Sequence, residues 1–221
     1  MLSPEETMKL LMIGNSHTYY NALPETLCQL LEATGQKTHV TMLAVGGKDL
    51  AFHATTQNAP FNIRCGGYDA VIVQDKATGF DPAELREYAK ALKDMADAAG
   101  SAFYLYMPWA ARDNRRAQSA MTDAYQEFCR GAGCAFAPAG EVFGRLLQTE
   151  APETLYREDG NHATPLGSYA AAVTVFYAVT GRKRILRVED FEDPGVKMGF
   201  PIELCQRIHT EALRTVRLFN G

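Results

Sequence analysis

Short apolar runs alternate with longer amphipathic segments along most of this chain. The runs at residues 10–13 (Leu-Leu-Met-Ile) and 70–73 (Ala-Val-Ile-Val) suit strands that are buried on both faces. Segments such as residues 82–99 instead place apolar side chains at helical spacing. Because strands that alternate with helices form right-handed crossovers, we expect a parallel sheet that is covered on both faces. The predicted fold is a three-layer α/β/α sandwich with a mainly five-stranded, flavodoxin-like sheet.

The same periodicity and the turn residues place the other elements. Strands are predicted at residues 38–45, 102–107 and 135–137, and helices at residues 23–33, 115–129, 140–148, 167–180 and from Pro201 onward. The charged residues 182–199 are expected to form a surface excursion. We predict one domain over residues 1–221, with a core at about 9–181 and a C-terminal extension, 182–221, that ends in a helix. The apolar face of this last helix could cover the sheet or contact a second subunit.

Charge and hydropathy exclude several classes of protein. The net charge of −4 gives no basic surface for nucleic acid, and we interpret the basic triplet at residues 182–184 (Arg-Lys-Arg) as a solvated turn rather than a binding patch. No apolar run reaches the roughly 18 residues that a membrane-spanning helix needs. The acidic start, residues 1–6, lacks the features of a secretory signal. We therefore expect a cytoplasmic protein that binds neither nucleic acid nor membranes.

The cysteines favour the same compartment. They are odd in number, widely spread and without a C-x-x-C pair, so reduced thiols are the simplest interpretation: Cys28, Cys65, Cys129, Cys134 and Cys205. No histidine lies near Cys129 and Cys134 in the sequence, so a zinc site is not expected. A complete G-x-G-x-x-G or G-x-x-x-x-G-K-[ST] motif is also missing, which weakens nucleotide binding. We expect no metal and no cofactor.

The first apolar run stops at Gly14 and is followed by the polar residues Asn15, Ser16 and Thr18. Gly14 permits a tight turn, and Ser16 would lie at the carboxyl end of the first strand. Ligands of open parallel sheets bind beyond these strand ends, so the Ser16 hydroxyl is well placed for chemistry. The alternative is that the three polar side chains only satisfy hydrogen bonds of the turn.

A second polar cluster, Asp159-Gly160-Asn161-His162, precedes the predicted helix at residues 167–180. This spacing allows the carboxylate of Asp159 to accept a hydrogen bond from one imidazole nitrogen of His162 while the other nitrogen faces outward. His162 would then be a general base, although an ordinary turn explains the residues equally well. The remaining histidines have no carboxylate at a useful spacing and are expected to be structural or exposed: His17, His39, His53 and His209.

Both polar clusters fall where a strand is expected to lead into a helix. Ser16 and His162 would therefore lie at the same edge of a parallel sheet and could meet across the crevice there. The chain order nucleophile, acid, base is one of several that produce a Ser-His-Asp arrangement. Together the clusters indicate nucleophilic catalysis more strongly than either does alone.

These residues resemble the SGNH (GDSL-like) hydrolase superfamily. The first block of that family, a strand followed by Gly-Asp/Asn-Ser, is similar to residues 14–16, and its last block, Asp-x-x-His, is similar to residues 159–162. The resemblance covers roughly residues 9–181. It implies that Ser16 is the catalytic serine, His162 the base and Asp159 the orienting carboxylate, and that an acyl-enzyme forms on Ser16.

The resemblance also implies an oxyanion hole. Its donors would be the backbone N–H groups of Ser16 and Gly47, together with a side-chain amide from the third block of the family, Gly-x-Asn-Asp. This chain departs from that block, since its third strand runs into Val-Gln-Asp-Lys at residues 73–76. Gln74 carries the same amide on a side chain one methylene longer, and we expect it to replace the asparagine. The departure indicates a divergent subgroup.

Aromatic and basic residues after two of the strands are candidates for binding substrate. Aromatic rings stack on sugars and a guanidinium binds acidic groups, so Tyr19, Trp109 and Arg112 are expected to line the crevice. Tyr20 is expected to pack its loop against the core. The leading hypothesis is a serine esterase for a small or carbohydrate-linked ester, with deacetylation favoured. The alternatives are a flavodoxin-like protein that binds phosphate or flavin, and a catalytically silent member of the hydrolase fold that binds a ligand.

Overall fold

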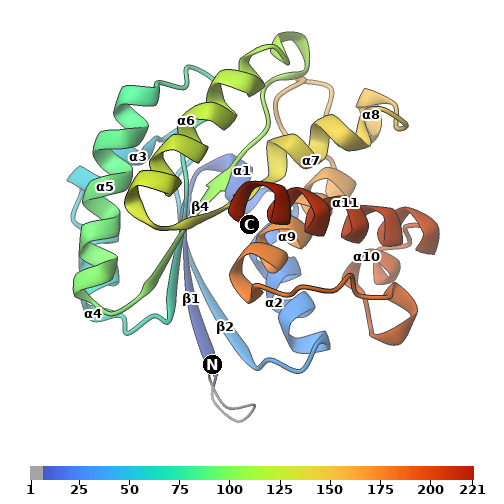
Figure 1. The fold of residues 1–221 in the computed structure, drawn as a ribbon, viewed down its shortest axis with the longest axis horizontal. Coiled ribbons are helices and arrows are strands. Elements are labelled where there is room, and N and C mark those ends of the chain that lie inside the picture. Colours follow the sequence, from blue (N-terminus) through green and yellow to red (C-terminus); the bar gives the residue numbers. More distant parts are fainter. Residues whose placement is uncertain (1–6) are drawn as a thin grey trace.

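A computed structural model describes residues 7–221 and contains one five-stranded parallel sheet between two layers of helices (Figure 1). The strand order is β2-β1-β3-β4-β5, the flavodoxin-like order, so the predicted fold class is confirmed. The strands are β1 (Met8–Gly14), β2 (Thr38–Ala44), β3 (Ala70–Gln74), β4 (Ala102–Met107) and β5 (Ala135–Pro138). The acidic residues 1–6, which entered the expectation about export, lie outside the described residues.

The two helical layers bury the two faces of the sheet (Figure 1). One layer contains α2 (Leu23–Ala33), α7 (Ala139–Leu146), α9 (Pro165–Thr180) and α11 (Ile202–Asn220), and the other contains α3 (Leu50–Thr55), α4 (Asn58–Cys65), α5 (Pro82–Ala98) and α6 (Ala117–Ala132). Alternate residues of β1 enter opposite cores: Leu10 and Met12 face the first layer, and Leu11 and Ile13 face the second. This two-sided burial explains why the strand is an uninterrupted apolar run.

Several short elements complete the chain and were not expected individually. They are the helices α1 (Ser16–Tyr19), α8 (Pro152–Leu155) and α10 (Pro194–Lys197) and the 3-10 turns η1 (Tyr20–Ala22), η2 (Arg112–Asn114) and η3 (Val188–Asp190). Three of them, α1, η1 and η2, follow β1 or β4 at the carboxyl edge of the sheet. This edge therefore carries the short irregular segments that can present side chains to a ligand.

The C-terminal part is more deeply packed than expected. Helix α11 lies against α7, α9 and β5, and most of its apolar residues are buried in the chain's own core, although Ile202 is 44% exposed. The segment before it is only partly a surface excursion, because Asp193 is 1% exposed and accepts hydrogen bonds from the Tyr169 hydroxyl and His209 Nε2. Contact of α11 with a second subunit stays a prediction. Within residues 7–221 no helix is long and apolar enough to cross a membrane.

Candidate active site

The Ser16 turn connects β1 to α1 and is built from buried polar groups. Asn15 caps α1, since its Oδ1 accepts the His17 N–H at 3.0 Å, and its Nδ2 donates to the Lys48 carbonyl at 2.8 Å. Asn15 is 2% exposed and Ser16 is 8% exposed. Asn15 therefore satisfies hydrogen bonds of the turn, as the alternative interpretation of these polar residues expected. The same turn also presents Ser16 at the edge of the sheet.

Side chains from neighbouring strands and helices form hydrogen bonds with this turn. The Gln74 Oε1 accepts hydrogen bonds from the Asn15 N–H at 3.0 Å and from the Thr18 hydroxyl at 2.8 Å. His53 Nε2 lies 2.8 Å from the Gly14 carbonyl oxygen, and the Tyr106 hydroxyl donates to the His17 carbonyl at 3.0 Å. Elements far apart in the sequence thus fix the backbone on either side of Ser16.

Gly14 is required at this point because the neighbouring side chains approach its backbone closely. A Cβ atom at residue 14 would collide with the hydroxyl of Thr18 and the side chain of Gln74. Its φ is not in the left-handed region. The glycine after β1 is therefore explained by close packing, whereas the sequence suggested only freedom to turn.

The loop before α9 forms a turn around the Asp159 carboxylate. Asp159 Oδ1 accepts the N–H groups of Asn161 and His162, each at 2.9 Å. Gly160 has a φ of 66°, a conformation that favours glycine, and its carbonyl accepts the Arg112 N–H at 2.7 Å. The turn consequently aims the Asp159 side chain at the ring of His162.

The two turns meet at the carboxyl edge of the sheet. His162 Nδ1 lies 2.6 Å from Asp159 Oδ2, and His162 Nε2 lies 2.9 Å from Ser16 Oγ. In the neutral imidazole, an Nδ1–H that donates to the carboxylate leaves Nε2 free to accept the Ser16 hydroxyl proton. The structure therefore brings together the three residues that the sequence singled out for nucleophilic chemistry.

The pKa values of Asp159 and of the neighbouring His17 suit this arrangement. Desolvation raises the pKa of Asp159, but the hydrogen bonds from His162 and from the backbone N–H groups outweigh it and lower the pKa to about 2. Burial, followed by the nearby charge of His162, lowers the pKa of His17 to about 4. Near neutral pH, Asp159 is thus ionised and His17 is neutral, so Asp159 is the charged partner of His162.

Two aromatic rings lie beside the His162 imidazole. The Tyr20 ring stacks on it with a centroid distance of 4.3 Å, and the His17 ring lies 5.6 Å away. The Arg157 guanidinium lies 5.3 Å from the Tyr20 ring, and the Arg157 N–H donates to the His162 carbonyl. Tyr20 was expected to pack its loop against the core, but its half-buried ring packs against the candidate base itself, which sequence position alone did not indicate.

The geometry contradicts the expected role of Gln74 as an oxyanion donor. Its side chain is fully buried, its oxygen holds the Ser16 turn, and its Nε2 donates to the Asp75 carbonyl. The amide therefore faces the protein interior. In contrast, the N–H groups of Ser16 and Gly47 make no hydrogen bond with another part of residues 7–221.

The expected substrate-binding residues have different surroundings. Trp109 is 1% exposed, stacks on Phe143 at 4.2 Å and donates from Nε1 to the Asn161 carbonyl at 2.8 Å, so it supports the loop of His162 and does not line the crevice. Tyr19 is 37% exposed and packs against Gly46. Arg112 is exposed beside Gly160. Only Tyr19 and Arg112 are thus available to a ligand.

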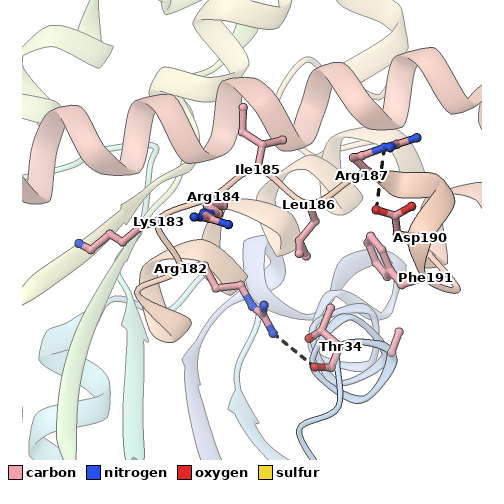
Figure 2. Close-up of a pocket in the computed structure, with 10 residues that line it drawn as sticks. Thr34, Arg182, Lys183, Arg184, Ile185, Leu186, Arg187, Asp190 and Phe191 are labelled. Atoms are coloured by element: carbon pink, nitrogen blue, oxygen red, sulfur yellow. Dashed lines mark hydrogen bonds and ion pairs between the residues drawn. The ribbon is translucent and has the colours of Figure 1, made fainter.

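Two cavities of about 760 Å³ lie in different parts of the molecule. One borders the candidate active site and is lined by Arg112, Arg157, Asp159 and neighbouring residues. The other, drawn in Figure 2, lies between the end of α2 and residues 182–191, where the Arg182 guanidinium donates to the Thr34 carbonyl. Because the 11 residues of α2, a length of about 16 Å, separate Thr34 from the Ser16 end of that helix, the second cavity does not belong to the active site.

Comparisons with solved structures identify the fold. A putative SGNH hydrolase from Slackia heliotrinireducens superposes with a TM-score of 0.66 and 24% identity over 79% of this chain and 100% of that one. A DUF4886 family protein from Bacteroides uniformis gives a TM-score of 0.79 and 19% identity over 96% and 95% of the two chains. Axe2, an acetylxylan esterase from Geobacillus stearothermophilus, gives 0.60 and 17% over 80% and 97%. No protein-family model and no curated protein matches the sequence. The chain has the fold of the SGNH hydrolases.

Proposed function

We propose that the protein is a serine esterase that hydrolyses a small or carbohydrate-linked ester through an acyl-enzyme on Ser16. The observation that carries the proposal is the continuous contact from Ser16 Oγ through the His162 imidazole to the Asp159 carboxylate, at 2.9 Å and 2.6 Å. Nucleophile, base and orienting acid in hydrogen-bond reach are the requirements of acyl transfer by serine. The shared fold with SGNH hydrolases supports the same conclusion.

The reaction proceeds in two steps at this site. His162 Nε2 removes the proton of Ser16 as Oγ attacks the ester carbonyl, and His162 then returns that proton to the departing alcohol. Asp159 fixes the imidazole tautomer and stabilises the imidazolium. Water, activated by His162, attacks the acyl-enzyme, releasing the acid and the free Ser16 hydroxyl.

The negative oxygen of the tetrahedral intermediate is assigned to backbone donors. The N–H groups of Ser16 and Gly47 are unoccupied, and the turn of Gly47 is tied to the Ser16 turn through the Asn15 amide. Gln74 is excluded from this role by its internal hydrogen bonds. Loss of a side-chain donor typically reduces the rate by about 10²–10³-fold, so we expect a slower enzyme than one with three donors.

The surroundings of the site support the proposed substrate class. Tyr19 offers a partly exposed aromatic ring, stacked on Tyr20, and Arg112 is an exposed residue with a guanidinium group; these suit a sugar ring and an acidic or hydroxyl-rich group. The structural similarity to Axe2, an acetylxylan esterase, favours an acetyl group on a carbohydrate. The proposal includes a cytoplasmic location, which the five free cysteines support.

The alternative functions account for fewer of the contacts. A flavodoxin-like phosphate site would use side-chain donors of the loop after β1 in addition to its N–H groups, but the Thr18 hydroxyl and the Asn15 side chain are already bonded within the protein. A silent binding protein would not need a histidine between a carboxylate and a hydroxyl. Neither alternative explains the Asp159–His162 contact.

The proposal is tested by hydrolysis assays. Wild-type protein should hydrolyse p-nitrophenyl acetate, and Ser16→Ala should reduce kcat to the background rate while the thermal unfolding temperature stays unchanged. Thr55→Ala is a matched control, because Thr55 is an exposed residue on α3 that bonds only to its own helix. A panel of acetylated sugars and short esters then identifies the acyl group. Turnover by Ser16→Ala equal to that of wild type would reject the proposal.

A further inference from the structure

The end of helix α6 brings two cysteine side chains into contact. Gly133 adopts a left-handed conformation with φ of 65°, and the Cys134 N–H donates to the Cys129 carbonyl at 3.1 Å. This is the hydrogen bond of a Schellman motif, in which the residue after the glycine packs against the last helical turn. A hydrophobic contact between these two positions frequently accompanies the motif, whereas here both residues carry thiols. Their sulfur atoms lie 3.4 Å apart.

We propose that Cys129 and Cys134 form a redox-modifiable pair that a hydroperoxide oxidises to an intramolecular disulfide. The backbone hydrogen bond between the two residues holds their side chains close together, with the two sulfur atoms already in contact. A disulfide bond is about 2.04 Å long, and the sulfur atoms must therefore approach by roughly 1.4 Å. The proposal concerns a part of the molecule away from Ser16 and does not depend on the esterase activity.

The pair is accessible to a small oxidant. A cavity of about 460 Å³ is lined by both cysteines together with Gln126, Arg130 and Phe219. Cys134 is partly exposed, while Cys129 is 4% exposed. The oxidant therefore meets Cys134 first, and Cys129 lies directly behind it.

The electrostatics assign different roles to the two thiols. The hydrogen bond with Cys129 and, against the effect of burial, the nearby ammonium of Lys93 lower the pKa of Cys134. The same hydrogen bond and burial raise the pKa of Cys129. Because the thiolate is the nucleophile, Cys134 is the attacking residue and Cys129 is the resolving residue.

The chemistry balances with one molecule of hydrogen peroxide, the simplest hydroperoxide, for each pair. The Cys134 thiolate attacks one peroxide oxygen, the O–O bond breaks, and the displaced hydroxide takes up a proton to form water. Cys129 Sγ then attacks the sulfenic acid on Cys134, the S–O bond breaks, and the second hydroxide leaves as water with the Cys129 proton. Two thiols are oxidised, the peroxide is reduced, and one disulfide and two waters result.

The test uses the full-length reduced protein and hydrogen peroxide. Trypsin cleaves after Arg130, between the two cysteines, and gives peptides 117–130 and 131–145. We expect treated wild-type protein to lose two of its five free thiols, to become lighter by two hydrogen atoms, and to yield these two peptides joined until a reductant is added. Peroxide that leaves both peptides separate while other cysteines are oxidised would overturn the proposal.

Matched variants distinguish the pair from general thiol oxidation. Cys65→Ser removes an exposed thiol on α4 and should leave the linkage between the two peptides unchanged. Cys134→Ser should abolish the linkage and protect Cys129 from oxidation, because the attacking thiolate is gone. Equal oxidation of Cys129 in Cys134→Ser and in wild type would contradict the assigned roles. The peptide linkage in wild type tests the pair itself even where a variant folds poorly.

Discussion

The two sides of the candidate triad are held in different ways. Ser16 is 8% exposed and stands on a buried network that joins Asn15, Gln74, His53 and Tyr106. Asp159 has a side chain that is 47% exposed, and its oxygens bond only within its own turn and to His162. The candidate nucleophile is therefore positioned by the core of the fold, whereas the candidate acid is positioned by a local turn.

Because of this difference, we expect substitutions at the two sites to affect catalysis and stability differently. Disturbing a buried polar network leaves donors without partners and destabilises the whole fold. Changing one atom of an exposed turn alters the local geometry with little effect on the core. We therefore expect substitutions in the exposed turn of Asp159 to affect only the reaction rate. Substitutions in the buried network that supports Ser16 should affect both the rate and the stability of the fold.

The largest effect is expected for Asp159→Asn. Asparagine can keep the bonds from the Asn161 and His162 N–H groups, but its amide would donate to His162 Nδ1 and stabilise the wrong tautomer. A loss of about 10⁴-fold in kcat is typical of this change in serine hydrolases, and the unfolding temperature should not move. Kinetics on p-nitrophenyl acetate beside a thermal melt provide the measurement. Activity within tenfold of wild type would show that the carboxylate is not needed.

Among substitutions in the buried network that supports Ser16, Gln74→Ala should cause the largest loss of stability. It removes the acceptor of the Asn15 N–H and the Thr18 hydroxyl and leaves a buried cavity, so we expect the free energy of unfolding to fall by about 3 kcal/mol. Urea denaturation measures this loss, with Gln29→Ala on the exposed face of α2 as the control. Unchanged stability together with a lower kcat would restore Gln74 as an oxyanion donor.

The buried residue Asp75 makes the stability of the fold depend on pH. Desolvation, opposed by the N–H groups of Leu50 and Lys76, raises its pKa to about 6. Between about pH 4 and 6 the folded state then holds a proton that the unfolded state has lost, so the stability contributed by Asp75 falls as pH rises through this range. Asp75→Asn should remove this dependence of the free energy of unfolding on pH. Between pH 4 and pH 7, the free energy of unfolding of Asp75→Asn should therefore rise relative to that of wild type by at most about 3 kcal/mol. Parallel curves of unfolding free energy against pH for the two proteins would contradict the assignment.

The smallest effect is expected from the ring that covers His162. Tyr20→Ala removes the stack, and because such contacts contribute about 0.5–1.5 kcal/mol, kcat should fall by about tenfold or less. Tyr20→Phe keeps the ring and should retain wild-type kcat, since the hydroxyl of Tyr20 makes no hydrogen bond among the described residues. A pH–rate profile of each variant checks whether the base is disturbed. Equal rates for Tyr20→Ala and Tyr20→Phe would assign the ring a purely structural role.

The regular parts of the fold could be predicted because their patterns are local. The helix at residues 23–33 has the predicted bounds, since Pro24 and the apolar spacing of its leucines specify its start and its buried face. The short helices α3 and α4 were missed because they have few turns over which a period can show. The parallel sheet between two helical layers followed from the alternation of strands and helices, which does not by itself specify the strand order.

The site could be predicted only where residue chemistry leaves one arrangement. Ser16, His162 and Asp159 have specific roles at a shared sheet edge, and the structure brings them together. An amide both donates and accepts, so the sequence could not tell whether Gln74 faces the substrate or the Ser16 turn. Trp109 was misplaced because a residue after a strand can turn either outward or, as here, into the core.

The most direct test of the account is covalent labelling of Ser16 by a fluorophosphonate. This reagent reacts with a serine hydroxyl that a neighbouring base activates. We expect the folded wild-type protein to gain one adduct on the peptide that contains Ser16, and Ser16→Ala and His162→Ala to remain unlabelled under the same conditions. A folded wild-type protein that stays unlabelled, or one labelled equally well without His162, would contradict the claim that these two side chains form a catalytic pair.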